Sequence, residues 1–123
     1  MRYTASHEWI RVEGKRATVG ITKYAQKELG EIVHVELPKV GEIVQVGDEA
    51  CVLESTKAAA DIYSPATGKI TAVNEVLRHS SEWVNKFPED KGWIYQMELT
   101  APLEEKMFLS YEQYLQLVMG KTL

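Results

Sequence analysis

The sequence has little that would mark a secreted, membrane or nucleic-acid-binding protein. It carries 14 Lys and Arg against 18 Asp and Glu, a net charge of −4, and therefore lacks the basic field that nucleic acids require. No apolar run approaches the roughly 18 residues of a membrane span. The N-terminal segment has neither a signal-peptide core nor the composition of a transit peptide. These absences predict an intracellular, cytoplasmic protein without a nucleic-acid or membrane partner.

Cysteine and histidine are also scarce. Cys51 is the only cysteine, so an internal disulfide is excluded. His7, His34 and His79 lie far apart in the sequence and show no metal-ligand spacing, so no metal site is predicted. Spacing alone leaves a catalytic Cys–His pair open. The apolar neighbours of Cys51, however, favour a buried structural thiol.

What the sequence has instead is a series of short alternating segments. Hydrophobic residues make up 45% of its 123 residues and charged residues 26%, which is typical of one globular domain. Many short strands separated by turn residues such as Gly14 and Gly47–Asp48 predict a mainly β protein, a small barrel or a sandwich. Apolar and polar residues alternate, as in half-buried strands, over residues 7–22, 31–38, 41–55, 60–75 and 93–100.

Two helices are indicated by their end signals. Thr22 is placed to cap a short helix over residues 23–29, and Gly30 suits the position after its last turn. The C-terminal segment has helical character, and Ser110 with Gln113 forms a capping box at its start. The strands are therefore accompanied by a short helix in the N-terminal half and a helical tail.

A weak internal repeat spans the middle of the chain. "GEIVQVG" at 41–47 aligns with "GKITAVN" at 68–74, and Gly47 then meets Asn74, which also tolerates positive φ. Two such halves related by a pseudo-twofold axis place the connection between them at an exposed end of the sheet. Lys57 lies in that connection.

Lys57 is a long cation among small side chains. In "ESTKAAADIYSP", residues 54–65, the neighbours of the lysine are Ser, Thr and Ala, which leave an ammonium open to a docking enzyme. A solvated surface lysine is the plainer interpretation. A nucleophilic lysine needs burial or a nearby cation to lower its pKa, whereas Glu54 and Asp61 favour the charged form. The residues alone indicate an exposed lysine on a turn.

Landmarks that match one family stand along nearly the whole chain, from about Tyr3 to Tyr114. They are "HEW" (7–9), "TVGIT" (18–22), "YAQ" (24–26), "GEIVHVELP" (30–38), "VGD" (46–48), "ESTKAAADIYSP" (54–65), "VNE" (73–75), "VN" (84–85) and "GW" (92–93). On these landmarks the sequence resembles the H proteins of the glycine cleavage system. The resemblance implies a mainly β barrel–sandwich hybrid, lipoyl-domain-like, with a short helix in the N-terminal half and C-terminal helices. It further implies a single carrier domain over 1–123, with a lipoyl-type hairpin core at about 41–74.

The resemblance implies that Lys57 carries lipoic acid through an amide bond and that the protein is a non-catalytic carrier. Its implied role is to shuttle the aminomethyl group of glycine from glycine decarboxylase (P-protein) to aminomethyltransferase (T-protein). Dihydrolipoyl dehydrogenase (L-protein) and a lipoate-protein ligase or lipoyl/octanoyl transferase are the other implied partners, and a monomer is expected. Biotin carriers share this architecture but normally flank their lysine with methionines, and Thr56 and Ala58 stand there in this chain.

Further site residues follow from the same resemblance. Ser6, Glu8 and Asp61 match positions of a cleft that shelters the loaded arm, and their carboxylates suit a cationic amine. Glu54 and Asp61 are expected to help the lipoylating enzyme to read the turn. From the residues alone, Ser6 only ends a strand, and Glu8 and Asp61 are ordinary surface acids.

The sequence departs from the family pattern in places. Lys23 stands where an acidic or polar residue is usual, and the loop "NKFPEDKGW" at 85–93 lacks the usual Asp and Tyr. Thr56 and Ala60 replace the more common Val and Ser beside an otherwise intact attachment turn. The departures leave two alternatives open: an H-like protein that relays lipoate to other enzymes, and an interaction module in which Lys57 is unmodified.

Overall fold

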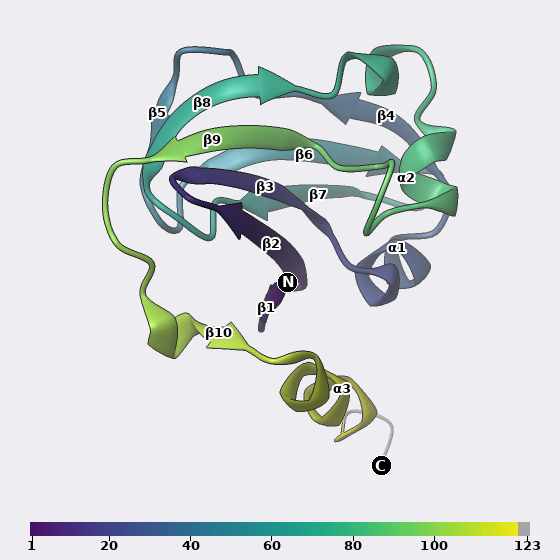
Figure 1. Ribbon diagram of the computed structural model, residues 1–123. Helices are drawn as coiled ribbons and strands as arrows, with labels where there is room; N and C mark the ends of the chain where they lie inside the picture. The colour runs from purple at the N-terminus through teal and green to yellow at the C-terminus, as the bar shows by residue number, and fades with distance from the viewer. Residues whose placement is uncertain (121–123) are drawn as a thin grey trace.

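The structure is a computed structural model that describes residues 1–120, and its strands form two sheets (Figure 1). The larger sheet has the order β10-β1-β2-β3-β9-β8-β5 and the smaller one β4-β6-β7, with antiparallel pairing throughout the ladders. The mainly β class predicted from the alternating segments is confirmed. The strands are β1 (Arg2–Thr4), β2 (Glu8–Glu13), β3 (Arg16–Ile21), β4 (Ile32–Glu36), β5 (Ile43–Val44), β6 (Glu49–Ser55), β7 (Ala59–Tyr63), β8 (Gly68–Val73), β9 (Tyr95–Leu99) and β10 (Phe108–Leu109).

Helical segments cover the ends of the sheets. Figure 1 shows α1 and α2 near the end at which the β6 arrow finishes, whereas α3 follows β10 away from them. The predicted helix starts are confirmed: Thr22 Oγ1 accepts a hydrogen bond from Ala25 N at 3.1 Å, and Ser110 and Gln113 cap each other at 2.9 and 3.2 Å. The helices are α1 (Lys23–Leu29), η1 (Glu75–Arg78), α2 (Glu82–Lys86), η2 (Glu105–Met107) and α3 (Tyr111–Gly120).

The alternating residues of both sheets supply the main core. The inward side chains of Ile10, Val19, Leu53, Ile70 and Met97 are at most 1% exposed. This burial removes apolar surface from water and is the main stabilising contribution to the fold. A second, aromatic cluster joins Trp9 and Tyr3 to Tyr114 of α3, so the C-terminal helix packs on the N-terminal strands.

The two copies of the weak repeat pair with each other. β5 runs antiparallel to β8, with Ile43 opposite Lys69 and Val44 opposite Gly68. Between them in the sequence, β6 and β7 form a hairpin in the smaller sheet. The turn of this hairpin contains Lys57, so the fold presents the lysine where two strands end.

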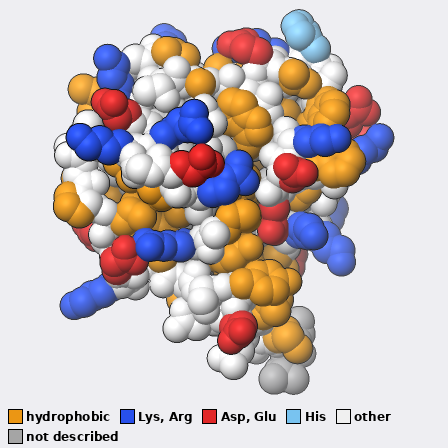
Figure 2. Space-filling view, viewed as in Figure 1, with side chains coloured by type: hydrophobic (Ala, Val, Ile, Leu, Met, Phe, Trp, Pro, Cys, Tyr) orange, Lys and Arg blue, Asp and Glu red, His pale blue; other side chains and the backbone are white. Residues whose placement is uncertain are grey.

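Charges of both signs cover the surface. On the face in Figure 2, Lys and Arg side chains are interspersed with Asp and Glu. Within residues 1–120, no helix has both the length and the apolar character needed to cross a bilayer.

Candidate functional site

Lys57 occupies the tip of the β6–β7 hairpin. β6 ends at Ser55 and β7 begins at Ala59, and the backbone closes with a 2.8 Å hydrogen bond from Ser55 N to Ala58 O. The lysine side chain is exposed, as are those of its two neighbours. The sequence-based prediction of an exposed lysine on a turn is confirmed.

The hydroxyl of Ser55 stiffens this turn from inside. Ser55 Oγ accepts hydrogen bonds from the backbone N–H groups of Lys57 and Ala58, each at 3.1 Å, and donates to Ala58 O at 3.1 Å. Serine commonly stabilises turns in this way because its short side chain reaches backbone groups two or three residues ahead. The lysine backbone is thus held while its side chain stays accessible.

The turn is also fastened to the segment that follows α1. Thr56 N donates to Glu31 O at 3.0 Å. Beside this bond the stem of Lys57 lies over Gly30: a Cβ atom placed on the glycine would be 3.3 Å from Lys57 Cε. The sequence assigned Gly30 only the role of ending α1, and its contact with the lysine had no signal in the sequence pattern.

Asn85 of α2 holds residues 30–32 in place. Its Oδ1 accepts from Ile32 N at 2.8 Å, and its Nδ2 donates to Ile32 O at 3.0 Å. Gln26 Nε2 donates to Gly30 O at 3.2 Å, and Ser81 Oγ donates to Ile32 O at 3.0 Å. The support of the lysine turn is therefore a backbone segment whose polar groups are paired from two helical regions.

Glu8 is buried at the start of β2, with 2% of its surface exposed. Its Oε1 accepts hydrogen bonds from Thr4 Oγ1 and Ser6 Oγ, both at 2.8 Å. Burial raises the pKa of Glu8, and the two hydroxyl groups offset part of that rise because they stabilise the carboxylate. The interpretation of Glu8 as an ordinary surface acid is wrong, since the β1–β2 turn folds over it.

His7 gives that turn its unusual backbone. Among residues 1–120 it is the one non-glycine residue with positive φ, 74°. His7 N donates to Thr4 O, and Thr22 N donates to His7 O, both at 3.1 Å. The ring Nδ1 lies 2.7 Å from Tyr114 Oη, which is itself 2.7 Å from Thr22 Oγ1. Groups from three separate segments therefore fix the residue between Ser6 and Glu8.

Asp61 lies apart from the Ser6–Glu8 pair. It belongs to the smaller sheet, opposite Val52 on β6, with its side chain exposed. Its acidic neighbour is Glu49, whose pKa Asp61 raises by charge repulsion and by a shared hydrogen bond. Glu54 is exposed three residues before Lys57, at the end of the same hairpin. The structure thus joins Ser6 to Glu8 directly, and it places Asp61 and Glu54 on the lysine hairpin.

The lysine and the buried carboxylate adjoin opposite ends of α1. Glu8 pairs with Ile21, immediately before the helix cap Thr22, whereas Lys57 lies over Gly30 at the other end. A helix of seven residues is about 10 Å long. The length of α1 is therefore the span that separates the lysine turn from the Ser6–Glu8 turn.

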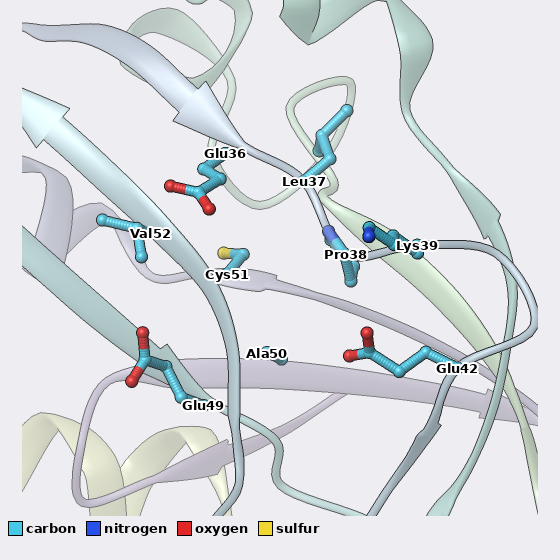
Figure 3. A pocket seen from close by; sticks show the side chains of 9 residues that line it. All are labelled: Glu36, Leu37, Pro38, Lys39, Glu42, Glu49, Ala50, Cys51 and Val52. Atoms are coloured by element: carbon cyan, nitrogen blue, oxygen red, sulfur yellow. The ribbon is translucent and has the colours of Figure 1, made fainter.

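An acidic hollow of about 200 Å³ lies at the far end of the hairpin. In Figure 3 the side chains of Glu36, Glu42 and Glu49 surround it, with Cys51 between them. Cys51 is 3% exposed, which confirms the predicted buried thiol, and burial raises its pKa and keeps it protonated. Lys57 is about 20 Å away along an extended strand, so the hollow is separate from the lysine site. Residues 1–120 contain no group of three or more side chains suited to a metal ion.

The chain is also similar to known proteins. A model of the family described as glycine cleavage H-protein matches residues 1–121. The chain belongs to this family.

Individual relatives agree along almost the full length. The glycine cleavage system H protein of Alcanivorax borkumensis is 48% identical over 114 residues, which cover 93% of this chain and 89% of the relative. That of Thermotoga maritima is 47% identical over 113 residues, 92% of this chain and 91% of the relative. The crystal structure of a glycine cleavage system H protein from Mycobacterium marinum superposes with a TM-score of 0.85 at 34% identity, covering 99% of this chain and 96% of that one. The lipoyl-domain-like fold expected from the sequence is confirmed.

Proposed function

We propose that the protein is the lipoyl carrier of the glycine cleavage system and that Lys57 carries lipoic acid in amide linkage. The observation that supports this most is the exposed lysine on a turn whose backbone is fixed by Ser55 and by Glu31. A modifying enzyme can reach such a lysine without unfolding its surroundings. Membership of the H-protein family supports the same role.

The residues around Lys57 fit this group. Thr56, Ala58 and Ala59 are small and exposed, so they leave room for an arm and for the enzymes that act on it. When bound, lipoate would supply a disulfide at the end of an arm with a reach on the order of 14 Å. This disulfide would be reduced as one sulfur takes up the aminomethyl group of glycine, and the dithiol left after the group has been passed on would be reoxidised. The domain itself is a non-catalytic carrier that stays outside the active sites of its partners.

The partners follow from this role. The P-protein loads the aminomethyl group, the T-protein passes its carbon to tetrahydrofolate with release of ammonia, and the L-protein restores the disulfide. A ligase or transferase attaches the lipoyl group, and we propose that it recognises Glu54 and Asp61, which are both exposed on the hairpin. The single-domain organisation, the monomeric state and the cytoplasmic location stay predictions.

Ser6 and Glu8 are proposed to shelter the loaded arm. An aminomethyl amine is cationic near neutral pH, and an ammonium beside a carboxylate in a partly dry site is stabilised more than in water. Glu8 already holds two hydroxyl donors on Oε1, which fixes its orientation. Asp61 lies on the other sheet, in the β6–β7 hairpin, and would contact the arm from that hairpin.

The lipoate-relay alternative rests on the departures at Lys23 and in the loop 85–93. The structure connects the two: Glu89 of the loop accepts a hydrogen bond from the backbone N of Lys23 at 2.8 Å. A carboxylate therefore remains at this end of α1, although it is supplied by another residue. The surface there is altered less than the sequence alone indicates, which favours glycine cleavage.

Exchange of labelled bicarbonate with the carboxyl group of glycine tests the proposal. With a P-protein, the lipoylated protein should support exchange, lipoylated Lys69→Ala should support it equally, and Lys57→Ala should not. Protein that is lipoylated and reduced by the L-protein, yet gives no exchange with the P-protein of its own organism, would favour the relay. Failure to accept lipoate at all would favour an unmodified interaction module.

A further inference from the structure

Gly30 leaves an open place that the stem of Lys57 fills. A Cβ atom on Gly30 would meet Lys57 Cε at 3.3 Å, Cδ at 3.6 Å and Cγ at 3.8 Å, and these are the three nearest heavy atoms outside residues 29–31. The first distance is tighter than an ordinary contact between carbon atoms. The lysine methylenes therefore lie flat against backbone that has no side chain.

The segment around Gly30 cannot easily move to admit a side chain. Asn85 pairs with both backbone groups of Ile32, and Gln26 Nε2 donates to Gly30 O. The Lys57 stem, in contrast, belongs to an exposed side chain whose torsion angles can change without moving the backbone. A side chain at position 30 would consequently displace the lysine rather than the segment beneath it.

The direction of the stem matters because α1 separates the lysine from the Ser6–Glu8 turn. Gly30 lies at one end of the helix, and Thr22, bonded to His7, lies at the other. The helix is about 10 Å long, and a lipoyl arm reaches on the order of 14 Å. An arm that starts flat against Gly30 is long enough to extend along α1 to the Ser6–Glu8 turn. An arm that leaves the surface at Gly30 extends into solvent instead.

We propose that Gly30 is a positioning residue for the lipoyl arm. Its missing side chain lets the modified lysine lie against the protein, so that the loaded end reaches Ser6 and Glu8. The inference rests on the proposed carrier function and deepens it, since it names the residue that directs the arm.

The variant Gly30→Ala tests this with Gly41→Ala as its matched control. Both glycines have positive φ, 85° and 95°, so both substitutions strain the backbone, but a Cβ on Gly41 has nothing within 4 Å. In the lipoylated proteins, ¹³C relaxation of the Lys57 ε-methylene reports the freedom of the stem. We expect an ordered methylene in the wild type and in Gly41→Ala and a mobile one in Gly30→Ala. Equal mobility in all three would overturn the proposal.

Ammonia loss gives a second readout. Water cleaves the loaded arm, R–S–CH₂–NH₂ + H₂O giving R–SH, formaldehyde and ammonia, and shelter slows this reaction. After loading by a P-protein, Gly30→Ala should lose ammonia about fivefold faster than wild type, the ratio that corresponds to about 1 kcal/mol. Gly41→Ala should match the wild type. Equal rates in wild type and Gly30→Ala would contradict the inference.

Two results separate this inference from the proposed function. A wild-type protein that accepts no lipoate or is not loaded by a P-protein contradicts the carrier function itself. A wild type that is loaded and protected, with Gly30→Ala protected equally, contradicts only the role of Gly30. An NOE between the Gly30 α protons and the Lys57 ε protons is expected in the wild type, and this measurement does not depend on the folding of any variant. The absence of this NOE would also overturn the inference.

Discussion

Two turns of this molecule each use a serine hydroxyl, but the effect on the neighbouring charged side chain is opposite. In the β6–β7 turn, Ser55 binds the backbone and leaves the charge of Lys57 in water. In the β1–β2 turn, Ser6 binds the charge itself, and Glu8 is buried. The first arrangement keeps a functional group accessible, whereas the second places an acid inside the fold.

The two turns consequently differ in how much of the fold depends on them. The lysine side chain is exposed and lies outside the buried core, so its removal should leave the core unchanged. The β1–β2 turn, in contrast, is linked to Tyr114, and through it to Thr22, by contacts of the His7 ring. Burial of the Glu8 carboxylate is costly unless such contacts keep the turn, and with it the hydroxyl partners of the carboxylate, in position. The site of attachment and a region on which the stability of the fold depends therefore lie at opposite ends of α1.

The largest expected difference is between Trp9→Ala and Lys57→Ala. Trp9, next to Glu8, is fully buried, and its Nε1 donates to Pro88 O at 2.9 Å. Its loss should cost about 3–5 kcal/mol, whereas Lys57→Ala should stay within about 0.5 kcal/mol of wild type. Chemical unfolding of both variants measures this. A large loss of unfolding free energy in Lys57→Ala with none in Trp9→Ala would show that Lys57, and not Trp9, belongs to the core.

Removing one hydroxyl should loosen the β1–β2 turn alone. Tyr114→Phe deletes the oxygen that contacts both His7 and Thr22, and leaving their polar atoms underpaired should cost about 1–3 kcal/mol. Tyr111→Phe, an exposed tyrosine on the same helix, is the control and should be nearly neutral. Hydrogen exchange at the Glu8 amide should quicken in the first variant only. Unchanged exchange would show that α3 does not support the turn.

Glu8→Gln should change how stability depends on pH. Because the pKa of Glu8 is raised in the folded protein, the native state keeps a proton that the unfolded state releases above about 4.5. The wild type should therefore lose stability as pH rises from 4.5 through the native pKa of Glu8, and Glu8→Gln should lack this loss. Glu13→Gln, an exposed acid on the same strand, should follow the wild type. Parallel curves for wild type and Glu8→Gln would contradict the burial of the charge.

The smallest effect is expected at the start of α1. Glu89→Gln removes the negative charge from the helix N-terminus at Lys23 and should cost about 0.3–1 kcal/mol. The double variant Lys23→Asp, Glu89→Gln returns an acid to the first turn and should recover most of the loss. Asp90→Asn, in the same loop, is the control. Equal melting of Glu89→Gln and Asp90→Asn would show that Glu89 does not substitute for the missing acid.

Much of the fold could be predicted because its signals are local. The β2–β3 hairpin around Gly14 and the cap at Thr22 each depend on a few adjacent residues. β1 and β10 had no such signal, since they are three and two residues long. Their pairing, Tyr3 with Leu109, joins the two ends of the chain and is set by tertiary packing.

The candidate site could likewise be predicted only where its signals are local. The exposure of Lys57 followed from its small neighbours and the strands beside it. The burial of Glu8 did not, because it requires a positive φ at His7 and the contact of His7 with Tyr114, 107 residues later in the chain. The contact between Gly30 and Lys57 likewise depends on two elements that meet only in the folded chain.

Attachment of the lipoyl group to Lys57 can be measured as an increase in the intact mass of the protein. The unmodified protein, incubated with lipoate, ATP and lipoate-protein ligase, should gain the mass of one lipoyl group. Lys69→Ala should gain the same mass, and Lys57→Ala should gain none. Addition to Lys57→Ala at the wild-type rate would contradict the account.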